Sequence, residues 1–435
     1  MPSSLLGGSA GSRVAGIPPR HRLVPVLVLA AVLLALSRVA AADPPLSLAE
    51  TLKIAVARSQ QIVSQRAMAD AAREMVVPAG ELPDPKLKVG VENVPTDGSD
   101  AWSLTRDFMT MSKVGLMQEF PREEKRRLKS QRAERDVERG AAVVEAATLA
   151  VERDAATAWV ARRFAELAER AIAAQTAEAE LNSTTLAAAY RSGKAPQSEL
   201  IAAQSMVIEL GNRATDAAAQ SKRARIALAR YAGGAADRPL GDAPDFDRLP
   251  EAARLADVDA QPELKLARAQ ESVAAASAAL AGAAKLPDWS AEVSYAFRGS
   301  PYSNMVSLMF TIDLPWSRGT RQDREHAAKL LELDAARAMR EDTQRMRAAD
   351  VESMVAEWES SRTQARRIEA ELLPLAKQRR EAALAAYRGG TGQLSAVLEA
   401  RRAQLDAELA LIGQQQSAAK AWAWLNFVVP AGEGS

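Results

Sequence analysis

The chain has 435 residues, of which 48% are hydrophobic but only 4% aromatic, and its 56 basic residues nearly balance its 55 acidic ones. Such a chain, rich in alanine and with 26% charged side chains, is typical of long helices packed side by side and not of a large globular core. There is no basic excess to neutralise phosphates, so nucleic-acid binding is disfavoured. There is also no cysteine, which excludes disulfides, thiolate catalysis and thiolate metal sites.

Residues 1–42 have the pattern of a secretory signal peptide. A basic region precedes a short apolar run from Leu23 to Leu36, and a small-residue site ends at Ala42. This order predicts cleavage after Ala42. The alternative is a membrane anchor, but the run is shorter than the ~20 residues that a spanning helix needs. Because no cysteine follows the cleavage site, we do not expect a lipoprotein.

The rest of the chain reads as two copies of one plan. Leu82-Pro83-Asp84 recurs as Leu286-Pro287-Asp288, and the segment from Leu186 to Leu210 matches the segment from Leu384 to Leu409. A stretch rich in Gly, Pro and Asp separates the copies. We therefore expect a first repeat over residues 43–231, a connector over 232–251, a second repeat over 252–429 and a tail over 430–435.

Each repeat is predicted to contain a helix, two short strands, a very long helix, a tight turn and a return helix. In the first repeat we expect these at about 46–79, 86–94, 108–120, 122–191, 190–196 and 197–231. In the second repeat we expect them at about 252–283, 289–298, 305–314, 316–388, 387–393 and 394–427. Pro374 should kink the second long helix. The first contains no proline, and at 1.5 Å per residue it reaches on the order of 100 Å.

The predicted strands alternate apolar and polar residues. In one of them, Val306, Leu308 and Phe310 alternate with Ser307 and Met309. About ten residues of this pattern suit a membrane-crossing barrel strand, apolar outward and polar inward, and aromatic residues concentrate near the strands as interfacial girdles would require. Four strands cannot close a barrel and open edges are not tolerated in lipid, so several chains must pool their strands. The alternative is a small soluble sheet capping a helical bundle.

The turns after the two long helices carry the most specific motif. An aromatic–basic pair is followed by a glycine and then by aliphatic residues and alanine. The matching residues are Tyr190, Arg191, Gly193, Glu199, Leu200, Ile201 and Ala203 in the first copy, and Tyr387, Arg388, Gly390, Val397, Leu398, Glu399 and Ala400 in the second. The strand exits, Gln118 to Arg127 and Ile312 to Arg321, are a second such element. On these motifs the chain resembles the TolC family of outer-membrane efflux proteins, and within it the heavy-metal (CzcC-like and CusC-like) branch.

The resemblance implies a mainly α fold with a small β part. Long antiparallel helical hairpins would form an α-barrel, and four strands per chain would make the twelve-stranded transmembrane β-barrel of a homotrimer. The protein would lie in outer-membrane lipid with a periplasmic extension, and its other partners would be a periplasmic adaptor (membrane fusion) protein and an inner-membrane RND-type pump. The resemblance also implies that the turns are tips that contact the adaptor, through Arg191, Ser192, Gly193, Lys194, Arg388, Gly389, Gly390 and Thr391. At Lys194, Thr391 and Ala396 the sequence departs from the usual family pattern.

No catalytic constellation is evident. His326 is the one histidine beyond residue 42, and neither a Gly-rich phosphate loop nor a spaced set of metal ligands is present. We therefore expect neither enzymatic activity nor a cofactor. Several methionines cluster near the strands and could hold Cu(I), although flexible apolar filling is the favoured interpretation. They are Met109, Met111, Met117, Met305 and Met309.

Carboxylates near the turns are candidates for a periplasmic gate. Repeated by trimer symmetry, they would attract cations and could hold the mouth shut through ion pairs with Arg191 or Arg402. These acids are Glu199, Glu209, Glu399 and Asp406.

The sequence therefore predicts the exit duct of a tripartite efflux system. It would passively conduct a substrate, for which heavy-metal cations are the favoured class. The first alternative is the same channel in multidrug efflux or type I secretion. The second, from another class of protein, is a soluble periplasmic coiled-coil scaffold.

Overall fold

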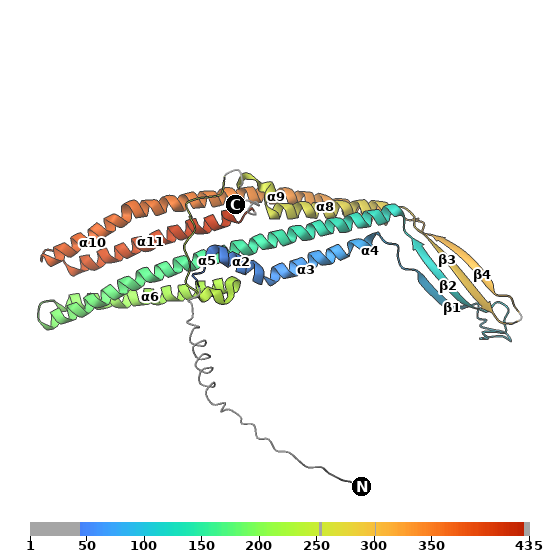
Figure 1. The fold of residues 1–435 in the computed structure, drawn as a ribbon, viewed down its shortest axis with the longest axis horizontal. Coiled ribbons are helices and arrows are strands. Elements are labelled where there is room, and N and C mark those ends of the chain that lie inside the picture. The colour runs from blue at the N-terminus through green and yellow to red at the C-terminus, as the bar shows by residue number, and fades with distance from the viewer. Residues whose placement is uncertain (1–43, 252–254, 301, 430–435) are drawn as a thin grey trace, which may run out of the picture. The chain divides into compact units, whose positions relative to one another are not determined.

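A computed structural model of the protein describes residues 44–251, 255–300 and 302–429. The predicted signal peptide and the predicted tail over 430–435 lie outside these residues. All the helices and strands named below belong to one unit that begins at Leu46. In Figure 1 its four strands lie at one end and its two interhelical turns at the other.

Three helices open the first repeat where the sequence pattern predicted one. They are α2 (Leu48–Arg58), α3 (Gln60–Glu74) and α4 (Val76–Gly80). The first break falls at Ser59, whose side chain accepts a 3.3 Å hydrogen bond from the Ile62 N–H and so caps α3.

The first long helix, α5 (Glu123–Arg191), runs without a break for 69 residues. It packs against the return helix α6 (Gln197–Ala232), and near its middle it buries small and aromatic side chains together. Ala155, Ala156, Trp159 and Val160 are fully buried there. The small side chains allow neighbouring helices to approach closely.

The second repeat contains η2 (Val258–Ala260), α8 (Pro262–Ala283), α9 (Gln322–Arg367), the π-helical turn η3 (Ile368–Leu372), α10 (Leu373–Arg388) and α11 (Leu394–Asn426). The predicted start of the long helix at residue 316 is wrong, because the chain first makes a turn in which Thr320 and Arg321 donate to the Ser317 carbonyl. The π-helical turn lies just before Pro374. Proline has no N–H to donate to the preceding turn of helix, so the wider turn forms where the kink was predicted.

The strands form one antiparallel sheet in the order β1 (Lys86–Glu92), β2 (Met111–Phe120), β3 (Trp289–Arg298) and β4 (Met305–Ile312). β2 pairs with β3, so the sheet joins the two repeats (Figure 1). The predicted end of β1 at residue 94, start of β2 at 108 and end of β4 at 314 each extend the strand two or three residues too far. Between β1 and β2, Asn93 takes a positive φ of 58° and its carbonyl accepts a hydrogen bond from Thr110 Oγ1, which turns the chain away from the ladder.

The connector folds back onto the helices. Its 3₁₀ helix η1 (Gly233–Asp237) leads to Leu240, which forms an isolated parallel bridge with Leu46. The buried Arg162 of α5 donates to the Ala236 carbonyl at 2.7 Å and to the Arg238 carbonyl at 2.9 Å. The largest apolar cluster, which includes Trp159, Leu228 and Trp422, lies beneath this segment. The connector therefore covers the main core.

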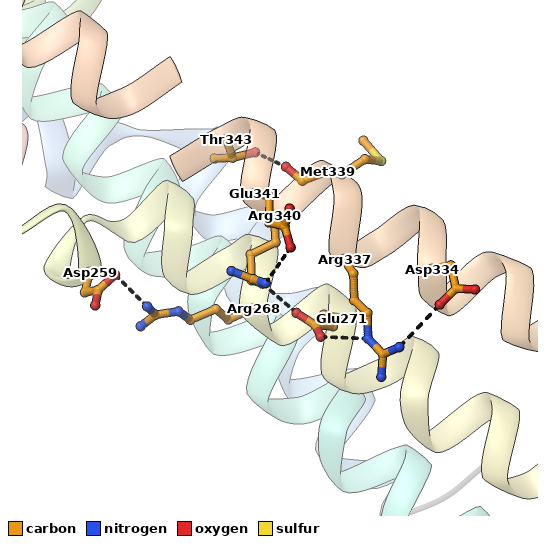
Figure 2. A network of polar contacts seen from close by, with 9 residues as sticks. All are labelled: Asp259, Arg268, Glu271, Asp334, Arg337, Met339, Arg340, Glu341 and Thr343. Atoms are coloured by element: carbon orange, nitrogen blue, oxygen red, sulfur yellow. Dashed lines mark hydrogen bonds and ion pairs between the residues drawn. The ribbon is translucent and has the colours of Figure 1, made fainter. Parts of the chain in front are cut away.

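Ion pairs link α8 and α9. Glu271 of α8 accepts from Arg340 Nε at 2.7 Å and pairs with Arg337 Nε at 3.4 Å, as Figure 2 shows. Between Leu333 and Arg347, α9 buries no side chain. Along this stretch of α9, ion pairs to α8 take the place of a buried apolar contact. Among the described residues, no helix combines the length and apolar character needed to cross a bilayer.

Candidate functional site

The two turns at the ends of the helical hairpins share one backbone geometry. In the first, Lys194 N–H donates to the Ala189 carbonyl at 2.9 Å, and in the second, Thr391 N–H donates to the Ala386 carbonyl at 3.0 Å. Gly193 and Gly390 have positive φ values of 70° and 74°. Left-handed glycine of this kind closes helix C-termini. The structure thus gives the glycines of the sequence motif equivalent roles.

All eight predicted tip residues are exposed. Arg191 Nε donates to the Ala187 carbonyl of its own helix at 3.3 Å. Among the described residues, neither Arg191, Lys194 nor Arg388 forms an ion pair. The tips therefore present cations to solvent that have no acidic partner among the described residues.

The candidate gate acids lie further along the hairpins, and three of them connect one hairpin to the other. Glu199 of α6 accepts a 2.7 Å hydrogen bond from the hydroxyl of Tyr387 on α10. This hydrogen bond, aided by burial and the nearby negative charge, raises the pKa of Tyr387 to about 12. The phenol therefore stays protonated and keeps its donor role over the physiological pH range.

Two ion pairs join α6 and α11 and lie one helical turn apart. In one pair α6 supplies the acid, and in the other it supplies the base. Glu209 of α6 pairs with Arg402 of α11, and Arg213 of α6 pairs with Asp406 of α11 at 2.9 Å. Beside them, Arg401 of α11 reaches Glu178 of α5 at 2.9 Å. Because acid and base alternate on each helix, sliding either helix by one turn would bring like charges together.

An apolar layer lies among the same helices. It contains Ile172, Ala179, Met206, Leu210, Ala217 and Leu405. The hairpins are thus held by a thin apolar contact with polar links on its surface.

The remaining gate candidate, Glu399, pairs with Arg379 at 2.8 Å, within the second hairpin. Of the two cations predicted to pair with the gate acids, Arg402 does so, and Arg191 contacts none of them. Sequence reasoning missed Tyr387, Arg213 and Arg401 as links. The opposite charges spaced four residues apart at Glu209/Arg213 and Arg402/Asp406 were the available signal.

At the other end of the unit, the sheet exposes its apolar face. Leu87, Leu116, Val293 and Leu308 lie opposite one another across all four strands, and the next row is Val89, Val114, Tyr295 and Val306. These eight side chains are between 39% and 73% exposed. Aromatic pairs lie toward both ends of the face, Phe120 stacked on Trp289 at 4.3 Å and Tyr295 against Phe297 at 4.6 Å.

The opposite face of the sheet is polar and partly buried. Lys88 Nζ lies 2.6 Å from Glu292 Oε2, and Lys113 Nζ lies 3.2 Å from Glu92 and 3.5 Å from Glu292. Ser290, Glu292 and Ser294 are buried, each at 8% exposure or less. This arrangement reverses that of a soluble sheet packed on a core. It is the predicted apolar-outward pattern.

Four of the clustered methionines belong to the polar face. Met117 and Met309 lie on either side of Glu292 in one cross-strand row, whereas Met305, opposite Ala296, and Met111, opposite Arg298, lie two and three rows further along the same face. Met305 and Met309 are about half exposed, at 46% and 52%. They therefore fill no gap within the protomer. No group of three or more His, Asp or Glu side chains arranged to hold a metal ion occurs in the described part of the chain.

With this geometry in view, comparisons with known proteins place the fold. Residues 258–429 match the family model "Outer membrane efflux protein". No curated protein gives a significant match to the sequence. The chain has the fold of outer-membrane channels.

Three solved structures illustrate the likeness. The CmeC outer membrane channel of Campylobacter jejuni is 15% identical, with a TM-score of 0.74 over 89% of this chain and 87% of its own. The MtrE outer membrane channel of Neisseria gonorrhoeae is 19% identical, with a TM-score of 0.70 over 88% of both chains. CusC, described as forming a transmembrane channel, is 13% identical, with a TM-score of 0.69 over 88% of this chain and 92% of its own.

These findings support the predicted mainly α fold with a small antiparallel sheet. The matched family model and the three solved structures are described as those of outer-membrane efflux proteins and channels.

Proposed function

We propose that the chain is one subunit of a trimeric outer-membrane efflux channel. The observation that carries the proposal is the pair of apolar rows that cross all four strands on the exposed face of the sheet. Exposing eight large apolar side chains to water is unfavourable, whereas lipid is a suitable neighbour for them. The polar face, with its Lys–Glu pairs, would then line a water-filled lumen.

The two edge strands explain why several copies are needed. β1 and β4 each pair on one side only, so each leaves a row of backbone groups unpaired. Unpaired backbone groups are not tolerated in hydrocarbon, and four strands are too few to close a barrel. In the proposed trimer, β1 of each chain pairs with β4 of its neighbour, giving twelve strands.

Cysteine cross-linking tests this arrangement directly, because the natural chain contains no cysteine. Val89→Cys in β1 combined with Val306→Cys in β4 should give covalent trimers on mild oxidation of membranes. Val89→Cys with Leu181→Cys, an exposed position on the long helix α5, is the matched control and should not. A processed wild-type protein that is monomeric in buffer without detergent would instead support the soluble scaffold.

The hairpin tips would form the periplasmic end of the channel. We infer that the polar links around Glu199, Glu209 and Asp406 hold this end closed, since they tie the two hairpins of a protomer together. The exposed tip residues, with the cations Arg191, Lys194 and Arg388, would contact a periplasmic adaptor that is joined to an inner-membrane pump. Transport energy would come from that pump.

For the cargo we propose heavy-metal cations, on the basis of the resemblance of the turn motifs to the CzcC-like and CusC-like branch. Deleting the gene should sensitise cells to divalent or monovalent soft metal ions and leave drug resistance unchanged. Sensitivity to drugs alone would point to multidrug efflux, and loss of a secreted protein to type I secretion.

A further inference from the structure

We propose that a basic cleft below the sheet, between α5 and α8, binds a phosphate-bearing anion. The cleft has a volume of about 370 Å³, and Lys329 of α9 closes one side. It lies where the strands meet the helices, since Pro121 directly follows β2 and Asp288 directly precedes β3.

The cleft carries an uncompensated positive charge. Four cations line it, Lys125, Lys129, Arg132 and Lys329, against the single acid Asp288. Asp288 is already bound to Lys125 at 2.8 Å, and Lys329 is paired with Glu332 outside the cleft.

Lys129 and Arg132 form no ion pair with any residue that the structure describes. They lie three residues apart on one face of α5, where like charges repel. A bound anion would relieve that repulsion.

A second cleft on the same two helices provides an internal comparison. Further along α5 and α8, Glu138 and Glu145 stand against Lys265 and Arg268, so its charges balance. Lys265 there reaches Glu145 at 2.7 Å. The basic excess is thus local to the cleft below the sheet and is not a general property of the α5–α8 groove.

The side chains present match phosphate. Arginine offers a planar fork that fits two phosphate oxygens, and lysine adds a mobile point charge. Leu280, Ala281 and Ala284 form an apolar wall beside them, which could accommodate the carbon part of a phosphate ester. Such an ester could be a phospholipid headgroup or a soluble anion.

The test uses the full-length protein purified in uncharged detergent, so it does not depend on channel activity. Binding of inorganic phosphate, short-chain phosphatidylglycerol and short-chain phosphatidylcholine would be measured by calorimetric titration at constant ionic strength in chloride. The test variant is Lys129→Gln/Arg132→Gln. The control, Arg127→Gln/Lys222→Gln, removes two exposed charges that lie outside the cleft.

We expect the test variant to bind phosphate or phosphatidylglycerol roughly tenfold or more weakly than wild type, because each lost contact is a hydrogen bond between charged groups. The control should bind as wild type does. Tighter binding of phosphatidylglycerol than of phosphate identifies the lipid headgroup as the source, and equal binding identifies a soluble anion. Equal affinity in wild type and the test variant, with both proteins equally helical, would overturn the proposal. The proposal would also be overturned if phosphatidylcholine bound as tightly as phosphatidylglycerol.

Discussion

The hydroxyl of Tyr387 donates a 2.7 Å hydrogen bond to Glu199 Oε2 and so joins the second helical hairpin to the first. Tyr190, its counterpart in the first repeat, is 41% exposed, and among the described residues its hydroxyl donates to no acid. Two positions that look equivalent in the sequence therefore differ in the structure. This difference makes Tyr190 a natural control for Tyr387.

Removing the Tyr387 hydroxyl should loosen the closed end of the proposed channel. We expect Tyr387→Phe to raise single-channel conductance in planar bilayers, because it deletes one link between the hairpins and leaves the ring in place. Tyr190→Phe should leave conductance unchanged. Equal conductance in wild type and both variants would show that this link does not hold the channel closed.

The hydrogen bond between Tyr387 and Glu199 should break only at strongly alkaline pH. The pKa of Tyr387 is raised from an ordinary value of 10.0 to about 12, so the folded protein favours the protonated phenol. The stability contributed by this preference is complete below pH 10 and is lost as the pH rises toward 12. A spectrophotometric titration should therefore show one tyrosine fewer ionising near pH 12 in Tyr387→Phe than in wild type. If the missing tyrosine instead ionises near pH 10, the hydrogen bond does not persist in solution.

Charge reversal should test the pairing of Glu209 with Arg402. Each single variant, Glu209→Arg or Arg402→Glu, places like charges together, whereas the double variant restores an ion pair of opposite order. We expect the single variants to lower the midpoint temperature of unfolding and to raise single-channel conductance. The double variant should return both quantities most of the way to their wild-type values. Because the two side chains are nearly half exposed, the coupling free energy should be only about 0.2–1 kcal/mol. Additive effects of the two single changes would contradict a direct pair.

Close packing of α5 on α3 predicts a difference between two helical glycines. A Cβ atom at Gly140 would lie 3.1 Å from Ala69 Cα and 3.2 Å from Ala69 Cβ, whereas one at Gly211 would meet nothing within 4 Å. Gly140→Leu should therefore destabilise the protein by about 1–3 kcal/mol, the usual cost of overpacking. Gly211→Leu should be neutral or stabilising, since leucine favours helix more than glycine does. Thermal unfolding followed by circular dichroism would show both effects.

Much of this architecture is readable in the sequence, because the decisive signals are local. The absence of proline predicts α5, and strict alternation predicts β3 with both of its ends. Local signals also explain the misses. The serine at 59 is a helix cap inside an otherwise helical pattern, and the segment after Pro315 contains a turn that delays α9 to Gln322.

The partners of the candidate gate acids could not be predicted in the same way. Which residue of α11 faces Glu209 depends on how far α6 and α11 are shifted along each other. That shift is set by the apolar layer around Leu210 and Leu405, and so by packing over the whole hairpin pair. The sequence suggested both Arg191 and Arg402 as partners, and only the packed structure distinguishes them. The methionines are a similar case, because only strand register shows that Met117 and Met309 flank Glu292.

The uncovered apolar rows of the sheet have a consequence for biogenesis. A single protomer whose sheet folded in an aqueous compartment would tend to aggregate with other copies through its unpaired edge strands. The main apolar core of the helices, by contrast, is buried within one chain. We therefore expect the helical hairpins to fold first. The strands of neighbouring copies would pair last, when the copies meet at the bilayer surface.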